Sequence, residues 1–190
     1  TLDKIGRFHS VDMIAESFNM ARGLGFDNIN MDIILGLPGE GVEEVKNTLE
    51  KIKKLDPESL TVHSLAVKRA ARLNNADEKY RHIEDLIISE SFKLSYEFCE
   101  NMGLEPYYLY RQKNMAGNYE NIGFAKPGRE CIYNIIIMEE KQDIIACGAG
   151  ASSKLTGITE GKAKRLENVK DPKLYIERIE DIIKNKEMIC

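Results

Sequence analysis

Hydrophobic residues recur at helical spacing early in the chain and then give way to a short apolar run. Residues 11–23 carry apolar side chains at intervals of three and four, with Ser10 as a candidate N-cap and glycine at the end, which predicts a helix. Residues 28–35 read Asn-Ile-Asn-Met-Asp-Ile-Ile-Leu and break abruptly at a Gly-Leu-Pro-Gly segment. This β-branched run predicts a strand that enters a tight loop.

The same order of elements then repeats. Helical spacing over residues 43–55 ends at Asp56-Pro57, and a second predicted strand covers residues 59–65. Connections this short between strand, helix and strand imply parallel pairing, because a helical crossover returns the chain to the same edge of a sheet. We therefore predict an α/β fold, barrel or open sheet, with its chemistry at the carboxyl ends of the strands, residues 36–38 and 66–68.

The second part of the chain has a different pattern. Its predicted elements, in order, are a helix over 78–102, a strand at 107–110, a polar loop over 111–130, an antiparallel hairpin of strands at 131–139 and 143–147, strands at about 154–158 and 163–168, and a helix over 172–185. The two patterns predict an α/β part over residues 1–103 and a smaller α+β lobe over 104–190.

Charge and composition narrow the classes of partner. The net charge of -4 gives no electrostatic footprint for nucleic acid or for an anionic membrane. The sequence has no apolar run long enough to cross a bilayer and no signal-peptide pattern, so a cytoplasmic protein is expected. The chain opens at Thr1 without an initiator methionine, which predicts a processed protein or a piece of a longer one.

The four cysteines, Cys99, Cys131, Cys147 and Cys190, are scattered along the chain. They form no C-x-x-C pair and have no histidine at ligand spacing, so the sequence predicts no metal site of its own. Scattered thiols in apolar surroundings are usually reduced residues, which favours a reducing compartment.

One carboxylate, that of Asp32, lies within an otherwise apolar strand. An uncompensated charge there costs several kcal/mol or so, which indicates a polar site, a strand end or a ligand. The alternative is structural, with a backbone N–H or an arginine satisfying the carboxylate. His63, in the second strand, is interpreted as a structural imidazole, and His9 and His82 as surface residues.

Three segments resemble motifs of one protein family. They are Asn-Met-Asp-Ile-Ile-Leu-Gly-Leu-Pro-Gly at 30–39, Gly-Phe-Ala-Lys-Pro-Gly-Arg-Glu at 123–130 and Cys-Gly-Ala-Gly-Ala-Ser at 147–152. In this order they are similar to motifs of the radical S-adenosylmethionine enzymes related to oxygen-independent coproporphyrinogen III oxidase, also called a dehydrogenase. The resemblance implies the second part of a partial (β/α) barrel, followed by a smaller α+β lobe with antiparallel strands.

The resemblance also implies a site for S-adenosylmethionine, formed by Arg7, Asp32, Ile34 and Ala66. A carboxylate and a guanidinium suit the zwitterionic and hydroxylated parts of that ligand, and the apolar side chains suit its ring. The structural alternative is that Arg7 and Asp32 form an ion pair.

Four basic residues are candidates for binding the carboxylates of the substrate: Arg111, Lys113, Lys126 and Arg129. They lie in the predicted polar loop, which we expect to face the mouth of the barrel. The alternative is a solvated basic loop.

The family's cluster motif, C-x3-C-x2-C, is absent from this sequence. A [4Fe–4S] cluster of this kind needs such thiolates. The simplest interpretation is that the chain is the carboxyl-terminal part of a longer enzyme, with the cluster ligands upstream, and that it is inactive alone.

The implied reaction begins when one electron from the cluster cleaves S-adenosylmethionine to a 5′-deoxyadenosyl radical. That radical abstracts hydrogen from two propionate side chains of coproporphyrinogen III, and loss of CO2 leaves the vinyl groups of protoporphyrinogen IX, a step of haem biosynthesis. The electron donor is not indicated. Two alternatives stay open: a relative that binds and delivers haem without decarboxylase activity, and a non-catalytic binding or scaffold module.

Overall fold

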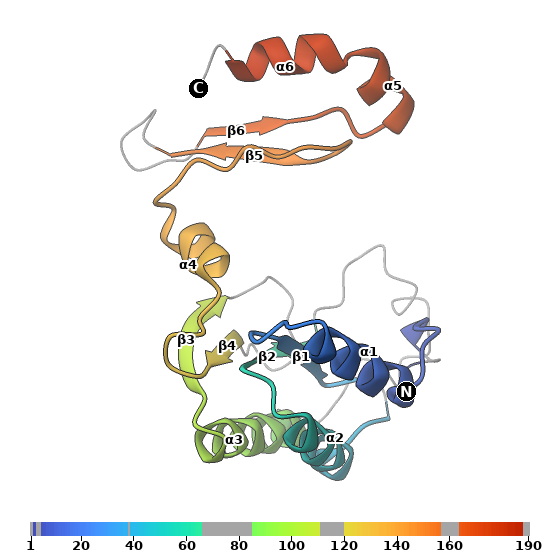
Figure 1. Ribbon diagram of the computed structural model, residues 1–190, viewed down its shortest axis with the longest axis vertical. Helices are drawn as coiled ribbons and strands as arrows, with labels where there is room; N and C mark the ends of the chain where they lie inside the picture. The colour runs from blue at the N-terminus through green and yellow to red at the C-terminus, as the bar shows by residue number, and fades with distance from the viewer. Residues whose placement is uncertain are drawn as a thin grey trace. The chain divides into compact units, whose positions relative to one another are not determined.

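The computed structural model describes residues 2, 5–37, 39–65, 85–110, 120–156 and 164–187. The chain forms two compact units, residues 1–131 and residues 132–190 (Figure 1). The sheet of the first unit extends beyond residue 103, where the α/β part was expected to end. That expected boundary stays a prediction.

The first unit contains a four-stranded sheet with helices. Its elements are α1 (Val11–Gly23), β1 (Asn30–Leu35), α2 (Val42–Leu55), β2 (Ser59–Ser64), α3 (Asp85–Asn101), β3 (Glu105–Tyr110) and β4 (Asn121–Ala125). The strand order is β1-β2-β4-β3, with β1 parallel to β2 and β4 antiparallel to both of its neighbours. The predicted parallel pairing is therefore confirmed, but the predicted loop over 111–130 is wrong at β4.

Local sequence explains where these elements begin and end. The Ser10 side chain accepts a hydrogen bond from the Met13 amide, 3.2 Å away, and so caps α1. The Glu44 carboxylate accepts from the Gly41 amide at 2.8 Å and satisfies a free donor at the start of α2. Strand β1 stops at Gly36, whose φ of 84° lies in the left-handed region that glycine adopts without strain.

Alternation along the strands gives the sheet one apolar face. The side chains on this face come from β1, β2 and β4 and pack against α2 and α3, which lie side by side on one side of the sheet (Figure 1). The buried core comprises Ile33, Leu35, Leu60, Val62, Ile122 and Phe124 from the sheet, with Val45, Leu49, Ile52, Ile88, Phe92 and Cys99 from the helices. The alternate residues of the strands lie on the other face, where Thr61 and Asn121 are also buried while Asp32 is exposed.

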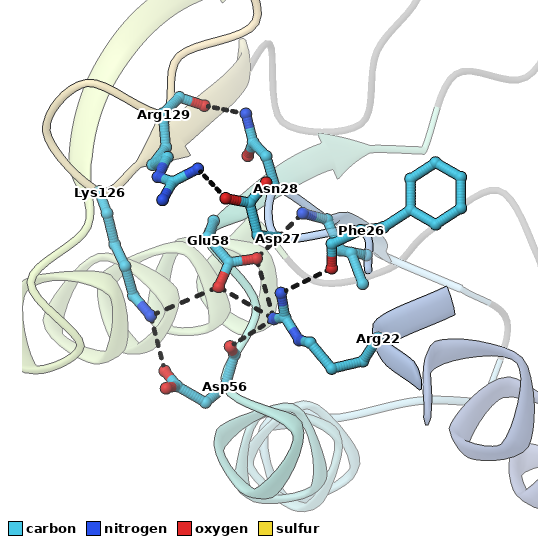
Figure 2. A network of polar contacts seen from close by, with 9 residues as sticks. Arg22, Phe26, Asp27, Asn28, Asp56, Glu58, Lys126 and Arg129 are labelled. Atoms are coloured by element: carbon cyan, nitrogen blue, oxygen red, sulfur yellow. Dashed lines mark hydrogen bonds and ion pairs between the residues drawn. The ribbon is translucent and has the colours of Figure 1, made fainter. Parts of the chain in front are cut away.

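A network of charges ties together the amino ends of β1 and β2 (Figure 2). Arg22, on α1, donates to both oxygens of Glu58 at 2.9 Å, and the Ile29 amide donates to the same carboxylate at 3.0 Å. The Lys126 ammonium lies 3.0 Å from Asp56 and 4.0 Å from Glu58. Because the Glu58 side chain is only 13% exposed, these donors are needed to compensate its buried charge.

The second unit has a small antiparallel sheet and three helices among its described residues. They are α4 (Ile132–Glu139), β5 (Ser152–Leu155), β6 (Lys164–Glu167), α5 (Pro172–Glu177) and α6 (Ile179–Glu187). The predicted strands at about 154–158 and 163–168 correspond to the paired β5 and β6, shifted by one or two residues where they are described. The predicted last helix is two helices, separated at Arg178.

The hairpin predicted from residues 131–139 and 143–147 is wrong. The first segment is the helix α4, and in the second only Ile144 makes a β-bridge, to Lys154. An apolar run of this length fits a buried strand and a helix equally well, because periodicity does not separate the two. No helix in the described part of the chain is long and apolar enough to cross a membrane.

We expect Glu58→Ala to lower the free energy of unfolding by about 3 kcal/mol, because it leaves Arg22 and the Ile29 amide without their acceptor. Burial alone raises the pKa of Glu58, but the Ile29 amide, Arg22 and Lys126 together outweigh it and hold that pKa below its ordinary value of 4.5. The ionised carboxylate therefore stabilises the fold above pH 4.5, and this stabilisation is lost as the pH falls through the lowered pKa.

Urea unfolding near neutral pH and again below pH 4.5 measures both effects. The difference between wild type and Glu58→Ala should shrink at the lower pH. The exposed Glu50 on α2 gives the matched control, Glu50→Ala, which should stay within about 0.5 kcal/mol of wild type. An equal loss in both variants would show that the network contributes nothing.

Candidate functional site

One row of residues crosses all four strands of the first unit. The register pairs Asp32 of β1 with Thr61 of β2, Thr61 with Gly123 of β4, and Gly123 with Tyr108 of β3. The row lies on the face opposite the apolar core, since the flanking Ile33, Val62 and Phe124 belong to that core. A carboxylate, a hydroxyl and a phenol are thus aligned on one face.

The Asp32 carboxylate is held by neighbours on the sheet itself. The Asn30 side-chain amide donates to Oδ1 at 2.7 Å, and Nε2 of His63 lies 3.8 Å from the same oxygen. The Thr61 hydroxyl donates in turn to Oδ1 of Asn30 at 3.2 Å. The Asp32 side chain is nevertheless 61% exposed, so it is both oriented and accessible.

These contacts change the acidity of two groups. His63 is the largest of the influences that hold the pKa of Asp32 below its ordinary value; burial opposes it, and Asn30 and Thr61 assist it. Burial raises the pKa of the Tyr108 phenol, which the interaction with Thr61 partly offsets. Near neutral pH the face therefore presents an ionised carboxylate and a neutral phenol.

A β-bulge aims Tyr108 across the sheet. Between Pro106 and Tyr108 the register with β4 shifts, so Tyr107 is an extra residue, and its ring meets that of Tyr108 edge to face with centroids 4.9 Å apart. The Tyr108 ring lies directly over Gly123, where a β-carbon would come within 1.9 Å of it. Only glycine at position 123 leaves room for this ring.

The other three residues predicted to bind S-adenosylmethionine are Ile34, Arg7 and Ala66. Ile34 lies on the same face as Asp32, two residues further along β1, and is half-buried. Arg7 is exposed, and among the described residues the basic side chain within 4.0 Å of the Asp32 carboxylate is that of His63, not that of Arg7. The structural alternative of an Arg7–Asp32 pair is therefore not met, and Ala66 lies outside the described residues.

Two of the four candidate substrate residues lie at the amino ends of the strands, away from the expected mouth. Lys126 pairs with Asp56 and Glu58, and Arg129 donates to Asp27 at 3.0 Å (Figure 2). These ion pairs favour a structural role for both side chains. Arg111 and Lys113 lie outside the described residues, and their role in substrate binding stays a prediction.

In the second unit, hydrogen bonds from three directions hold the turn at 147–152. The buried Asn168 donates from Nδ2 to the Gly148 carbonyl at 2.8 Å, and the Gly148 amide donates to the Tyr175 hydroxyl at 3.0 Å. Lys186 donates to the Ala146 carbonyl next to the turn. The turn is therefore a fixed backbone element.

The described residues contain no group of three His, Cys, Asp or Glu side chains that is placed to hold a metal ion. Cys99 is buried, which raises the pKa of its thiol to about 12, whereas Cys131 and Cys147 are exposed. A cluster that needs several thiolates together does not fit the described cysteines.

Comparisons with known proteins bear on this arrangement. The chain is 48% identical, over 180 residues, to the oxygen-independent coproporphyrinogen-III oxidase-like protein HemZ of Bacillus subtilis (strain 168), covering 95% of this chain and 36% of that protein. Nearly the whole of this chain is therefore similar to part of an oxygen-independent coproporphyrinogen-III oxidase-like protein. It is also 31% identical to the heme chaperone HemW of the same organism, covering 94% of this chain and 42% of that protein. No family model matches the sequence.

A solved structure has a similar fold. Coproporphyrinogen III oxidase (HemN) from Escherichia coli, described as a radical SAM enzyme, superposes with a TM-score of 0.61 and 19% identity, covering 95% of this chain and 40% of that chain. At this identity the likeness shows the fold alone. It confirms the predicted fold class, the second part of a partial (β/α) barrel with a smaller α+β lobe. The chain spans about two fifths of the length of these relatives.

Sequence reasoning found Asp32 but missed the residues that surround it. Asn30 with Asp32, and Thr61 with His63, are polar pairs at positions i and i+2 of their strands, a signal for one polar face. Tyr108 and Gly123 give no such signal, because their contact depends on a bulge and on the unpredicted β4.

We expect Gly123→Ala to displace the Tyr108 ring from the row and to lower the free energy of unfolding by about 1–3 kcal/mol, because the added methyl group would overlap that ring. Denaturant unfolding measures the loss. The double variant Gly123→Ala/Tyr108→Ala should be less destabilised than the sum of the two single variants, since the clash is then gone.

Gly23, at the end of α1, is the matched control, because no heavy atom lies within 4 Å of the position that a β-carbon would take. Gly23→Ala should leave stability within about 0.5 kcal/mol. Strictly additive effects in the double variant would disprove the close packing of Tyr108 on Gly123.

Proposed function

We propose that this chain forms the S-adenosylmethionine-binding sheet and the following lobe of a radical S-adenosylmethionine enzyme that oxidatively decarboxylates coproporphyrinogen III to protoporphyrinogen IX. The observation that carries the proposal is the oriented, exposed Asp32 carboxylate on the polar face of the sheet, in a chain 48% identical to a coproporphyrinogen oxidase-like protein.

The geometry of Asp32 and Ile34 suits this cofactor. Both lie on the polar face of β1, where Asp32 is ionised near neutral pH and Ile34 offers an apolar surface beside it. A carboxylate accepts hydrogen bonds from hydroxyl or ammonium groups, and an aliphatic side chain packs against a ring. Arg7 and Ala66 complete the proposed set.

When bound, S-adenosylmethionine supplies the carbon radical chemistry of such enzymes. The chain's own residues bind and orient it: Asp32 accepts from the donors of the ligand, while Asn30 and Thr61 keep the carboxylate in place. The sequence contains no cluster motif, so the thiolates for a [4Fe–4S] cluster would come from a segment other than these 190 residues.

Haem binding and delivery without decarboxylation is a second candidate, favoured by the 31% identity to a heme chaperone over 94% of this chain. The polar face of the sheet suits a bound S-adenosylmethionine under either function. The two candidates differ in what they do to a porphyrin, and this difference decides between them.

The test uses the full polypeptide that contains this chain, purified without oxygen and supplied with iron, sulfide and a reductant. We expect conversion of coproporphyrinogen III to protoporphyrinogen IX that depends on added S-adenosylmethionine. We expect Asp32→Ala to weaken S-adenosylmethionine binding by about tenfold or more, the equivalent of about 1.4 kcal/mol.

Asp27→Ala is the matched control, because Asp27 precedes the same strand but pairs with Arg129 at its amino end. It should bind S-adenosylmethionine as wild type does. Tight haem binding without decarboxylation would move the assignment to haem delivery, and wild-type protein that binds no S-adenosylmethionine would refute the proposed site.

A further inference from the structure

Two side chains from different strands approach one oxygen of Asp32. The Asn30 amide, on β1, donates to Oδ1 at 2.7 Å, and Nε2 of His63, on β2, lies 3.8 Å from the same oxygen. Because both contacts are made to Oδ1, they fix which way the carboxylate plane faces. A ligand would meet Oδ2.

The register places His63 beside both proposed cofactor residues of β1. His63 is the direct cross-strand partner of Ile34, and Thr61, two residues earlier on β2, is the partner of Asp32. Neighbouring strands lie about 4.8 Å apart, so a ligand that touches both Asp32 and Ile34 reaches the His63 ring. The His63 side chain is 32% exposed and so is accessible from this face.

We propose that His63 is a positioning residue of the S-adenosylmethionine site, which holds Oδ1 of Asp32 with Asn30 and turns Oδ2 toward the ligand. This inference rests on the proposed function. The separation of 3.8 Å exceeds hydrogen-bond length, and a shift of about 0.6 Å brings the pair within it. Hydrogen bonds in binding sites often shorten in this way when the ligand arrives.

Substitution at position 63 separates a positioning role from a purely structural one. Leucine removes the ring nitrogens of His63, whereas glutamine keeps a neutral hydrogen-bond donor.

The experiment measures the dissociation constants of S-adenosylmethionine and S-adenosylhomocysteine by calorimetry. It uses the full polypeptide that contains this chain. His63→Leu should weaken the binding of both ligands by about tenfold, because the contact to Oδ1 is lost.

His63→Gln keeps a neutral donor, so we expect a loss of only about threefold for either ligand. His9→Gln, a substitution ahead of α1, is the matched control and should behave as wild type. Wild-type affinity for both ligands in both His63 variants would overturn the inference alone. Wild-type protein that binds neither ligand would overturn the proposed function and the inference together.

Discussion

Burial of the apolar face of the four-stranded sheet is the constraint on which the rest of the first unit depends. Helices α2 and α3 cover the face that carries Leu35, Leu60 and Phe124, and the burial of this face specifies the register of each strand. A shift of one residue would expose these side chains and bury Asp32. The position of the carboxylate on the polar face therefore follows from hydrophobic packing on the opposite face, before any ligand is considered.

The two ends of the parallel strands serve different purposes. At the amino ends, Glu58 compensates Arg22 and Lys126, and Arg129 pairs with Asp27, so the charges there balance one another. On the polar face, the Asn30 amide and the His63 imidazole lie against Asp32, which keeps an exposed, ionised carboxylate. A balanced network suits a structural junction, whereas an oriented and accessible charge suits a ligand site.

The sequence predicted the features that depend on local pattern. Helices α1 and α2, strands β1 and β2 and their parallel pairing follow from spacing, caps and connection length. The helix α4 was predicted as a strand, because eight residues rich in isoleucine fit both. Strand β4 was missed because its Asn and Gly residues are typical of loops. In the structure Gly123 lies within this strand, because a side chain at that position would overlap the Tyr108 ring. The partners of Asp32 come from β1 and β2, and only the register shows that they meet.

The most direct test of the central claim, that the polar face of β1 and β2 binds the cofactor, is to map the binding by NMR. The full polypeptide that contains this chain, labelled with ¹⁵N, would be titrated with S-adenosylhomocysteine, and amide shifts would be followed. We expect the largest changes at residues 32–36 and 61–65, with residues 26–29 and 56–58 at the amino ends unaffected. Changes confined to the amino ends, or none at all, would contradict it.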